Sequence, residues 1–458
     1  MRTFLSLLLA LFLLEGCANY DSETYTADIL PAENTAEQYN LNLAWWGVYG
    51  DKDLERLVAL ALKRNVDYAV AAITINRALY EAKILGAELV PTFSADIGET
   101  ASRRLDGLTG ENAGQDRVTH SYTSQLGVSY EIDLWQRLRN AATAQEWEYQ
   151  ATILDRETAR LALVNSVVSG YFNLRYLNQA IELTEASVRR YSQLLDITKT
   201  RNELGKVDSV EPWQAEQSLL AEQNSLVSLQ TERKQAEQTL RDLLNLRPGE
   251  DLQIGSADLL TTPTAEVNLD VPIAALAARP DIRASEARLQ GAFKTVQASR
   301  GDWYPSITVG SSLSASSQRS SSLFDVPYLA GTISINLPFL QWNTLRWNLK
   351  ISEEAFEQTK LELEQAVTTA LNEVDAAYTA YGNTRRILEQ TRAKHEIDVR
   401  IASYYEDRYR LGATELSDWL EALNTADESL LSALSAKYQL ISWENQIYKA
   451  MGGRYEPK

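Results

Sequence analysis

The chain is poor in the residues that usually carry covalent or metal chemistry. Its 458 residues include a single cysteine, Cys17, and two histidines, His120 and His395. One cysteine excludes an intrachain disulfide, and no cluster of cysteine, histidine and carboxylate residues has the spacing of a metal site. The motifs of phosphate loops, dinucleotide-binding folds and serine hydrolases are also absent. The sequence therefore offers no obvious catalyst, metal site or cofactor site.

Two further absences restrict the function. The net charge of −18 argues against a protein that binds nucleic acid. Behind the N-terminal leader, no segment stays apolar over the roughly 18 residues that a transmembrane helix needs. Any membrane-spanning part would then have to be a β-barrel, because only helices and closed barrels satisfy the backbone in lipid.

The N-terminus has the pattern of a cleavable leader. Arg2 precedes a largely apolar run at residues 3–14, which is too short to span a bilayer and is typical of a secretory signal peptide. The arrangement that ends at Cys17 resembles the lipobox of bacterial lipoproteins. The resemblance implies cleavage after Gly16 and a covalent lipid on Cys17, and Ala18 is compatible with sorting to the outer membrane. The alternative is a plain signal peptide with an incidental cysteine.

Two copies of one pattern make up most of the chain. Several features recur at a constant offset of 207 residues, namely Trp135 and Trp342, Arg139 and Arg346, Tyr171 and Tyr378, and Leu204-Gly205 and Leu411-Gly412. Nearer the N-terminus, Asn65-Val66-Asp67 corresponds to Arg279-Pro280-Asp281, and Pro91 to Pro305. The pattern predicts a signal peptide at 1–16, a lipidated N-terminal linker at 17–50, a first repeat at 51–245, an equatorial linker at 246–272 and a second repeat at 273–453.

Each copy is predicted to begin with a helix and two strands. Apolar residues three and four apart indicate helices at Asp53–Leu85 and Ile273–Ser299. Alternating apolar and polar residues predict strands at Thr92–Thr100, Tyr122–Ile132, Ile307–Ala315 and Leu329–Leu337. These lengths fit the strands of a membrane barrel, although a soluble sheet lying on a core would show the same alternation. His120 is expected in a loop between strands, and His395 on a long helix.

Each copy is predicted to end in a long helical hairpin. Residues 139–201 and 346–410 contain no proline and one glycine each, and a helix of this length is a rod of roughly 95 Å. Their apolar residues alternate in spacings of three and four, which indicates a coiled-coil seam. A Leu-Gly turn ends each rod, and return helices are predicted at Val210–Leu244 and Leu416–Met451. Four strands are too few to close a barrel, which needs about eight, so several chains would share it.

In this order and spacing, the chain resembles the outer-membrane efflux protein family of TolC-like channels, in its lipoprotein branch. The residues that carry the resemblance are Trp45-Trp46, Asp53-Leu54, Ala61-Leu62 through Asp67, Glu131 through Trp135, Arg279 through Arg283, and Arg408 through Gly412. The resemblance implies an α+β membrane protein that forms a homotrimer. Four strands per chain would build a twelve-stranded outer-membrane β-barrel, continued by a periplasmic α-helical coiled-coil barrel.

The function that the resemblance implies is a passive exit duct in the cell outer membrane. Its partners would be a periplasmic membrane-fusion adaptor and an inner-membrane resistance-nodulation-division pump. The periplasmic gate would be acidic and would fall on Asp418, Glu421 and Glu211, while Thr414 stands where some members carry a gate arginine. The adaptor would contact the two turns, at Leu204, Gly205, Lys206, Leu411, Gly412 and Ala413.

Three alternatives remain open at this point. The chain could be a periplasmic coiled-coil structural lipoprotein without a pore, or the outer-membrane component of type I protein secretion. It could also be a cell-envelope hydrolase that uses paired carboxylates such as Asp96 and Glu131. The alternation of the strands disfavours the hydrolase, because it places these carboxylates on the faces predicted to line a pore. The sequence does not indicate which molecule is transported.

Overall fold

The computed structural model describes residues 39–103, 118–264, 267, 273–322 and 327–457. Cys17, the signal peptide and most of the N-terminal linker lie outside these residues. Two compact units are formed from interleaved stretches of chain. In their described parts, the first unit contains residues 75–152 and 284–364, and the second contains the remainder.

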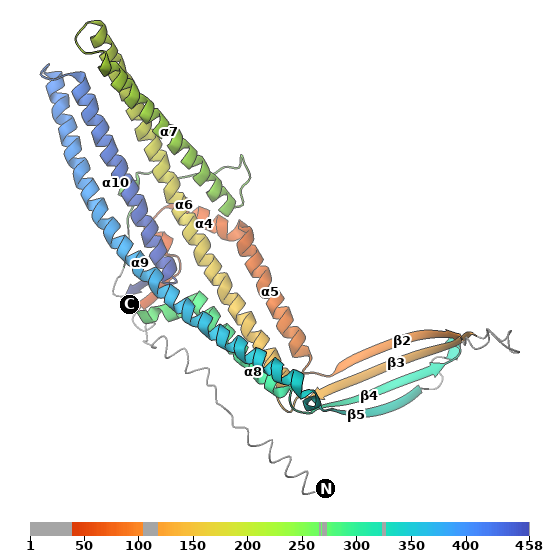
Figure 1. The fold of residues 1–458 in the computed structure, drawn as a ribbon. Helices are drawn as coiled ribbons and strands as arrows, with labels where there is room; N and C mark the ends of the chain where they lie inside the picture. The colour runs from red at the N-terminus through yellow and green to blue at the C-terminus, as the bar shows by residue number, and fades with distance from the viewer. Residues whose placement is uncertain (1–38, 104–117, 265–266, 268–272, 323–326, 458) are drawn as a thin grey trace. The chain divides into compact units, whose positions relative to one another are not determined.

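The described elements repeat one order twice (Figure 1). A helix, a strand pair, a long helix and a return helix run from α5 to α7, and again from α8 to α10. Their bounds are β1 (Tyr39–Asn42), η1 (Trp45–Tyr49), α4 (Lys52–Arg64), α5 (Val66–Ala87), β2 (Thr92–Arg103), β3 (Val118–Ile132), α6 (Arg137–Glu203), α7 (Val210–Leu243), η3 (Leu259–Thr261), η4 (Ile273–Ala278), α8 (Pro280–Gly301), β4 (Ser306–Ser317), η5 (Ser320–Ser322), β5 (Pro327–Asn336), η6 (Pro338–Gln341), α9 (Trp342–Arg410), α10 (Leu416–Ala450) and β6 (Arg454–Pro457).

The first unit contains an antiparallel sheet in the order β2-β3-β4-β5. Residues paired across neighbouring strands lie on the same face, and the register aligns apolar residues with one another in successive rows. Leu126 pairs with Leu313, which in turn pairs with Leu329. The same face carries Phe93 and Ile333, which are 80% and 75% exposed. One face of the sheet is therefore apolar and left uncovered by the described residues, whereas the other carries mainly serine, threonine and glycine.

All four predicted strands are present, and each is longer than expected. β3 begins at Val118 rather than Tyr122, so His120 lies in a strand and the expectation of a loop is wrong. Its Nδ1 atom lies 2.8 Å from the Glu99 carboxylate on β2. The residues predicted as a polar loop extend the pairing of β2 with β3. Alternation in the sequence does not reveal this extension, because polar residues lie on both faces there.

The helix predicted at Asp53–Leu85 is instead two helices, because the chain breaks at Asn65. Asn65 has an extended backbone, and its side-chain oxygen accepts from the Tyr68 amide at 2.9 Å. A short polar side chain that satisfies the next helix start in this way favours a break between helices. In the second copy, the helix predicted from Ile273 begins as α8 only at Pro280, after the short helix η4.

A matching contact shows how the internal repeat is built. The Asn65 Nδ2 atom donates to the carbonyl of Leu243 at 3.0 Å, at the end of α7. The Arg279 Nη1 atom donates to the carbonyl of Ala450 at 2.7 Å, at the end of α10. Arg279 follows Asn65 by 214 residues, and Ala450 follows Leu243 by 207, so the two contacts are equivalent. Each one satisfies a carbonyl at a helix C-terminus that has no partner within its own helix.

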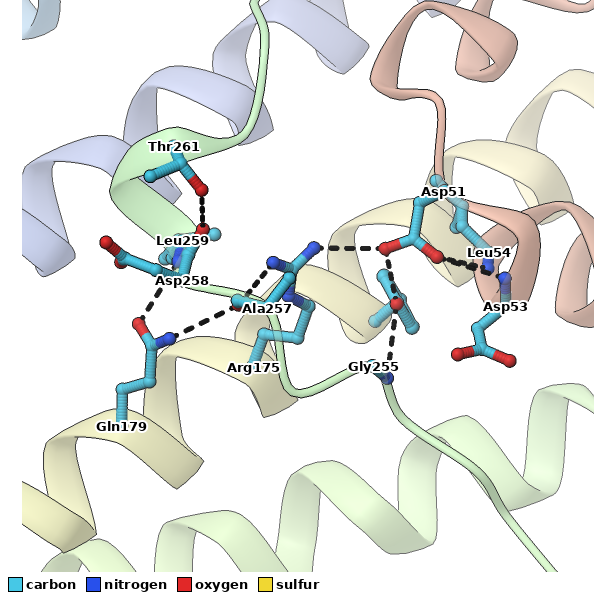
Figure 2. A network of polar contacts seen from close by, with 11 residues as sticks. Asp51, Asp53, Leu54, Arg175, Gln179, Gly255, Ala257, Asp258, Leu259 and Thr261 are labelled. Atoms are coloured by element: carbon cyan, nitrogen blue, oxygen red, sulfur yellow. Dashed lines mark hydrogen bonds and ion pairs between the residues drawn. The ribbon is translucent and has the colours of Figure 1, made fainter.

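A polar network in the second unit attaches the linker between the copies to α6 (Figure 2). One Asp51 oxygen caps α4 by accepting from the amides of Asp53 and Leu54, at 3.0 and 3.2 Å. The other oxygen accepts from the Tyr171 hydroxyl at 2.6 Å and from Arg175 Nη1 at 3.0 Å.

The linker side of the network consists of backbone groups. Arg175 Nη2 donates to the Ala257 carbonyl at 2.5 Å, and the Gly255 amide donates to the Tyr171 hydroxyl at 3.3 Å. Burial, together with the Asp51 carboxylate, raises the pKa of Tyr171, which keeps its hydroxyl protonated. We refer to Asp51, Tyr171, Arg175, Gly255 and Ala257 as the linker clamp.

Candidate functional site

The two helical hairpins turn in the same way at the residues predicted to contact an adaptor. Gly205 and Gly412 have positive φ angles of 66° and 71°, a conformation that favours glycine. The amide that follows each glycine, at Lys206 and Ala413, donates back to the carbonyl five residues earlier at 2.8 Å. This is the Schellman ending of a helix.

Each turn presents a leucine to solvent. Leu204 is 65% exposed and Leu411 is 83% exposed. Leucines at such exposure leave most of their apolar surface uncovered, so each tip offers an apolar side chain for contact with another surface. The prediction that these turns are adaptor contacts remains a proposal, and the geometry of the tips is compatible with it.

Asp418 has a role at the start of α10. Its carboxylate accepts from the backbone amide of Glu415 at 3.3 Å, and the Glu415 side chain in turn accepts from the amide of Asp418, which makes a capping box. The Thr414 hydroxyl also hydrogen-bonds to the Asp418 carboxylate. Thr414 therefore contacts an acidic residue without supplying a charge.

Glu421 and Asp418 line one groove between α9 and α10. The groove has a volume of about 240 Å³, and its other lining residues are Asp398, Ile401, Tyr405, Ala422 and Thr425. A hydrogen bond from Lys394 holds the pKa of Asp398 below its usual value. Three carboxylates thus face one small groove near the second turn.

Glu211 lies on the other hairpin, in the first turn of α7, and it precedes Asp418 by 207 residues. The structure brings Asp418 and Glu421 together in the groove, whereas Glu211 occupies the equivalent place in the first copy. An acidic residue in the first turn of a helix is also favoured by the helix dipole.

Contacts between the two hairpins were not anticipated from the sequence. Arg201 on α6 forms an ion pair with Glu415, which precedes α10. Farther from the turns, Arg190 pairs with Asp427 and its Nε atom donates to Asn424 at 2.7 Å. The signal was available, since Arg190 and Arg201 are three helical turns apart on one face of α6, and their partners have nearly the same spacing.

The carboxylates of the hydrolase alternative are far apart. Asp96 pairs with Gln125 in the sheet, whereas Glu131 pairs with Thr308 and accepts from Arg137 at 2.8 Å. Gln125 and Glu131 are six positions apart on β3, which corresponds to roughly 20 Å. Paired acid–base chemistry needs both carboxylates around one bond, so Asp96 and Glu131 do not form such a pair.

Within the described residues, no helix is both long enough and apolar enough to cross a membrane.

Comparison with protein families gives a match over most of the chain. A family model described as "Outer membrane efflux protein" matches residues 57–246 and 271–453. A relative named toxin and drug export protein A, from Aggregatibacter actinomycetemcomitans, is 42% identical over 97% of this chain and 96% of its own length. The pyoverdine export outer membrane protein OpmQ of Pseudomonas putida is 28% identical over 90% of this chain and 88% of its own.

Solved structures have the same fold. A crystal structure of CusC superposes with a TM-score of 0.78 and 22% identity, covering 93% of this chain and 99% of CusC. The open state of the Neisseria gonorrhoeae MtrE outer membrane channel gives a TM-score of 0.76 and 26% identity, covering 87% of this chain and 89% of MtrE. The predicted fold, that of a TolC-like channel with an internal repeat, is therefore confirmed.

Proposed function

Since the chain belongs to the outer membrane efflux protein family, we propose that it is the passive exit duct of a tripartite efflux system. It is an outer-membrane efflux protein, and we propose that it assembles as a homotrimer with an adaptor and a pump. In this view it catalyses no covalent chemistry, and an inner-membrane pump supplies the energy.

The four-stranded sheet is the main observation that supports the proposal of a duct. It has an apolar face that is exposed on all four strands, and its outermost strands β2 and β5 each pair with one described neighbour. Unpaired strand edges and an uncovered apolar face are both costly in water. Three copies joined edge to edge would form a twelve-stranded barrel with the apolar face toward lipid and the polar face toward the lumen. This arrangement supports a homotrimer.

The hairpin tips are the proposed docking points for a periplasmic membrane-fusion adaptor, which would connect to a resistance-nodulation-division pump. The contact residues are Leu204, Gly205, Lys206, Leu411, Gly412 and Ala413. The exposed leucines and the identical backbone of the two turns support this assignment, because one adaptor surface could then engage both tips.

The proposed gate consists of Asp418 and Glu421, with Glu211 at the equivalent place in the first copy. Three copies of each residue would form carboxylate rings, which attract cations and repel one another. Closure therefore requires donors from neighbouring groups, and the hydrogen bond from Thr414 to Asp418 is one such contact.

A lipid on Cys17 is the proposed anchor, which makes the protein a lipoprotein of the outer membrane. Acylation adds an anchor of its own, whereas the barrel would carry the insertion of the trimer. The leader pattern and the position of this sole cysteine support the proposal.

Small molecules are the proposed cargo, and a protein toxin is the second candidate. Toxin and drug export protein A, a relative that is 42% identical, has both toxin and drug export in its name. Type I protein secretion therefore stays as the alternative. The assignment can be tested by crosslinking in living cells from a photoreactive residue at the exposed Leu411, followed by mass spectrometry. Capture of an adaptor would support the duct, and the transporter associated with that adaptor would distinguish drug efflux from protein secretion. Capture of peptidoglycan or soluble proteins alone would favour a structural lipoprotein without a pore.

A further inference from the structure

The apolar face of the four-stranded sheet stops at the end where the sheet meets the helices. At this end β3 leads into α6 and β5 leads into α9 (Figure 1). The last apolar row pairs Ile132 with Ile307, and Ile307 with Ile335. From this row to the row that pairs Ser124 with Ala315, β3 extends over eight residues, or roughly 27 Å. With the usual tilt of barrel strands, the apolar face is about 20 Å tall, which is close to the lipid-facing band of a membrane barrel. The residues that follow Ile132 would thus lie where lipid headgroups begin.

A short sequence motif occupies this position in both copies. The motif Trp-x-x-Leu-Arg occurs at residues 135–139 and 342–346. Its tryptophans, Trp135 and Trp342, are 46% and 57% exposed. Its arginines, Arg139 and Arg346, are exposed as well, whereas Leu138 is buried. Tryptophan is enriched where a membrane meets water, because its ring is apolar and its N–H group is polar. Each motif therefore presents one aromatic ring and one guanidinium group at the end of the apolar face.

The two arginines lie where a helix disfavours positive charge. Arg139 is in the first turn of α6, Arg346 directly follows the first turn of α9, and neither turn contains an acidic residue. The N-terminal end of a helix carries a partial positive charge, so a cation there is unfavourable and an anion is favourable. In the first copy, Asp133 precedes the helix and accepts from the Arg139 amide at 2.8 Å. The equivalent residue of the second copy, 207 positions later, is Leu340, so no carboxylate meets Arg346 from that position.

Neither guanidinium group of the two motifs is paired with a carboxylate in the part of the chain that the structure describes. Arg137, inside the first motif, shows the alternative, because it lies 2.8 Å from Glu131 and 3.8 Å from Asp302. Arg346 instead lies over the ring of Trp347, at 5.1 Å from its centre. An exposed guanidinium group that stacks in this way keeps N–H donors for a ligand, and its planar fork fits the oxygens of a phosphate.

Arg139 faces away from the helices that flank α6. α6 contacts α5 where Gln145 donates to Glu81 at 3.3 Å, and it contacts α8 where Arg288 lies 3.4 Å from Glu148. At about 100° per residue, Arg139 is turned by roughly 120° from Gln145 and by roughly 180° from Glu148. Both neighbouring helices thus lie on one side of α6 and Arg139 lies on the other. This is the convex side of the layer, which becomes its outer side when such layers close into a ring.

We propose that the two Trp-x-x-Leu-Arg motifs bind the phosphate groups of phospholipids in the periplasmic leaflet of the membrane. Arg139 and Arg346 would each donate to one phosphate, and the rings of Trp135 and Trp342 would lie among the glycerol groups. A soluble phosphate would satisfy the arginines equally, but it would leave the neighbouring Leu134, which is 56% exposed, uncovered. A lipid covers both kinds of surface. This inference rests on the proposed barrel, because only a membrane-embedded sheet places lipid at this level.

Native mass spectrometry of the purified full chain with phosphatidylglycerol tests the site. Arg139→Gln combined with Arg346→Gln should weaken lipid binding about fivefold at each site, which is the effect of removing one cation near a lipid surface. The matched control is Arg189→Gln combined with Arg400→Gln, which removes two exposed arginines from the same helices, far beyond the motifs in the sequence. The control should bind lipid as the unchanged protein does. Equal loss in the control, or no loss in the first variant, would overturn the proposal.

Further arms of the experiment identify the occupant. Diacylglycerol, which has no phosphate, should bind about fivefold more weakly than phosphatidylglycerol, and equal binding would overturn the recognition of phosphate. Glycerol phosphate should leave the lipid bound, and displacement of the lipid would assign the site to a soluble phosphate instead. The unchanged protein provides a test that needs no variant to fold. Its retention of phosphatidylglycerol should fall as salt rises from about 50 to about 500 mM, because screening weakens the attraction between arginine and phosphate. Retention that does not respond to salt would contradict the proposal.

Channel recordings in planar bilayers separate this inference from the proposed duct. A conducting trimer that binds lipid equally well without Arg139 and Arg346 would leave the duct intact and refute the lipid site. Lipid bound through the two arginines by a protein that forms no conducting trimer would support the lipid site and refute the duct.

Discussion

Replacing Arg175 by methionine should release the linker between the two copies. The Arg175 side chain is 3% exposed and connects the Asp51 carboxylate to the Ala257 carbonyl in the linker clamp. Methionine fills much of the same space over Phe172, so the main change is the loss of the charge and of two hydrogen bonds. Such a change tests whether polar contacts or apolar anchors hold this segment.

The expected cost follows from the groups left behind. Removing one member of a buried ion pair costs about 3–5 kcal/mol, because the other charge stays buried. Asp51 is only 16% exposed, but it keeps the Tyr171 hydroxyl and two backbone amides as donors, so we expect about 3 kcal/mol. A cost of this size corresponds to roughly a 100-fold increase in local opening.

Hydrogen exchange of the purified protein measures this opening. The Gly255 amide donates to Tyr171, and the Leu259 amide donates to Gln179 at 3.3 Å, so both report on the linker. Arg160→Met is the matched control, because the ion pair of Arg160 is with Glu157 on the same helix. Unchanged exchange in Arg175→Met would refute the reasoning and show that buried leucines such as Leu259 hold the segment.

Three further changes have defined outcomes. Asp418→Ala with Glu421→Ala should raise single-channel conductance and weaken cation selectivity in planar bilayers, since carboxylate rings would be lost; unchanged conductance would place the gate elsewhere. Cys17→Ser should abolish acylation in mass spectra while the trimer still forms, and loss of trimer would show that the lipid is needed for assembly. Burial lowers the pKa of Lys437 to about 8, so the unfolded chain binds more protons between about pH 8 and 10.5 and stability should rise there by up to roughly 3 kcal/mol. Melting curves of Lys437→Met should lack this rise, and parallel pH profiles would contradict the assignment.

The long elements could be predicted because their patterns persist over many turns. The rod expected at residues 346–410 is α9, and the return helix expected at Val210–Leu244 is α7 within one residue. The presence of the four strands was equally predictable, because apolar and polar residues alternate along each of them. The break at Asn65 was not, because a single asparagine within a helical periodicity does not reveal that its side chain caps the next helix through the Tyr68 amide.

The residues of the candidate site were predictable to different degrees. Glycine at 205 and 412 identifies the turns directly, because the positive φ angle favours this residue. The linker clamp escaped prediction, since Asp51, Tyr171 and Ala257 belong to three segments with no common periodicity. Hydrogen bonds between distant segments leave no pattern in either one, so only the folded chain reveals them.

The paired contacts of Asn65 and Arg279 explain why the repeat is so faint in the sequence. Both side chains satisfy the same helix-end carbonyl, yet one is a neutral amide and the other a guanidinium. The buried charge of Arg279 also needs carboxylate partners, and its Nη2 atom lies 2.6 Å from Asp281 and 3.1 Å from Glu373. What the repeat requires at this position is thus a side-chain hydrogen-bond donor to the helix-end carbonyl, and several residue types can provide one. It follows that equivalent positions of the two copies are better compared by the group they satisfy than by residue identity.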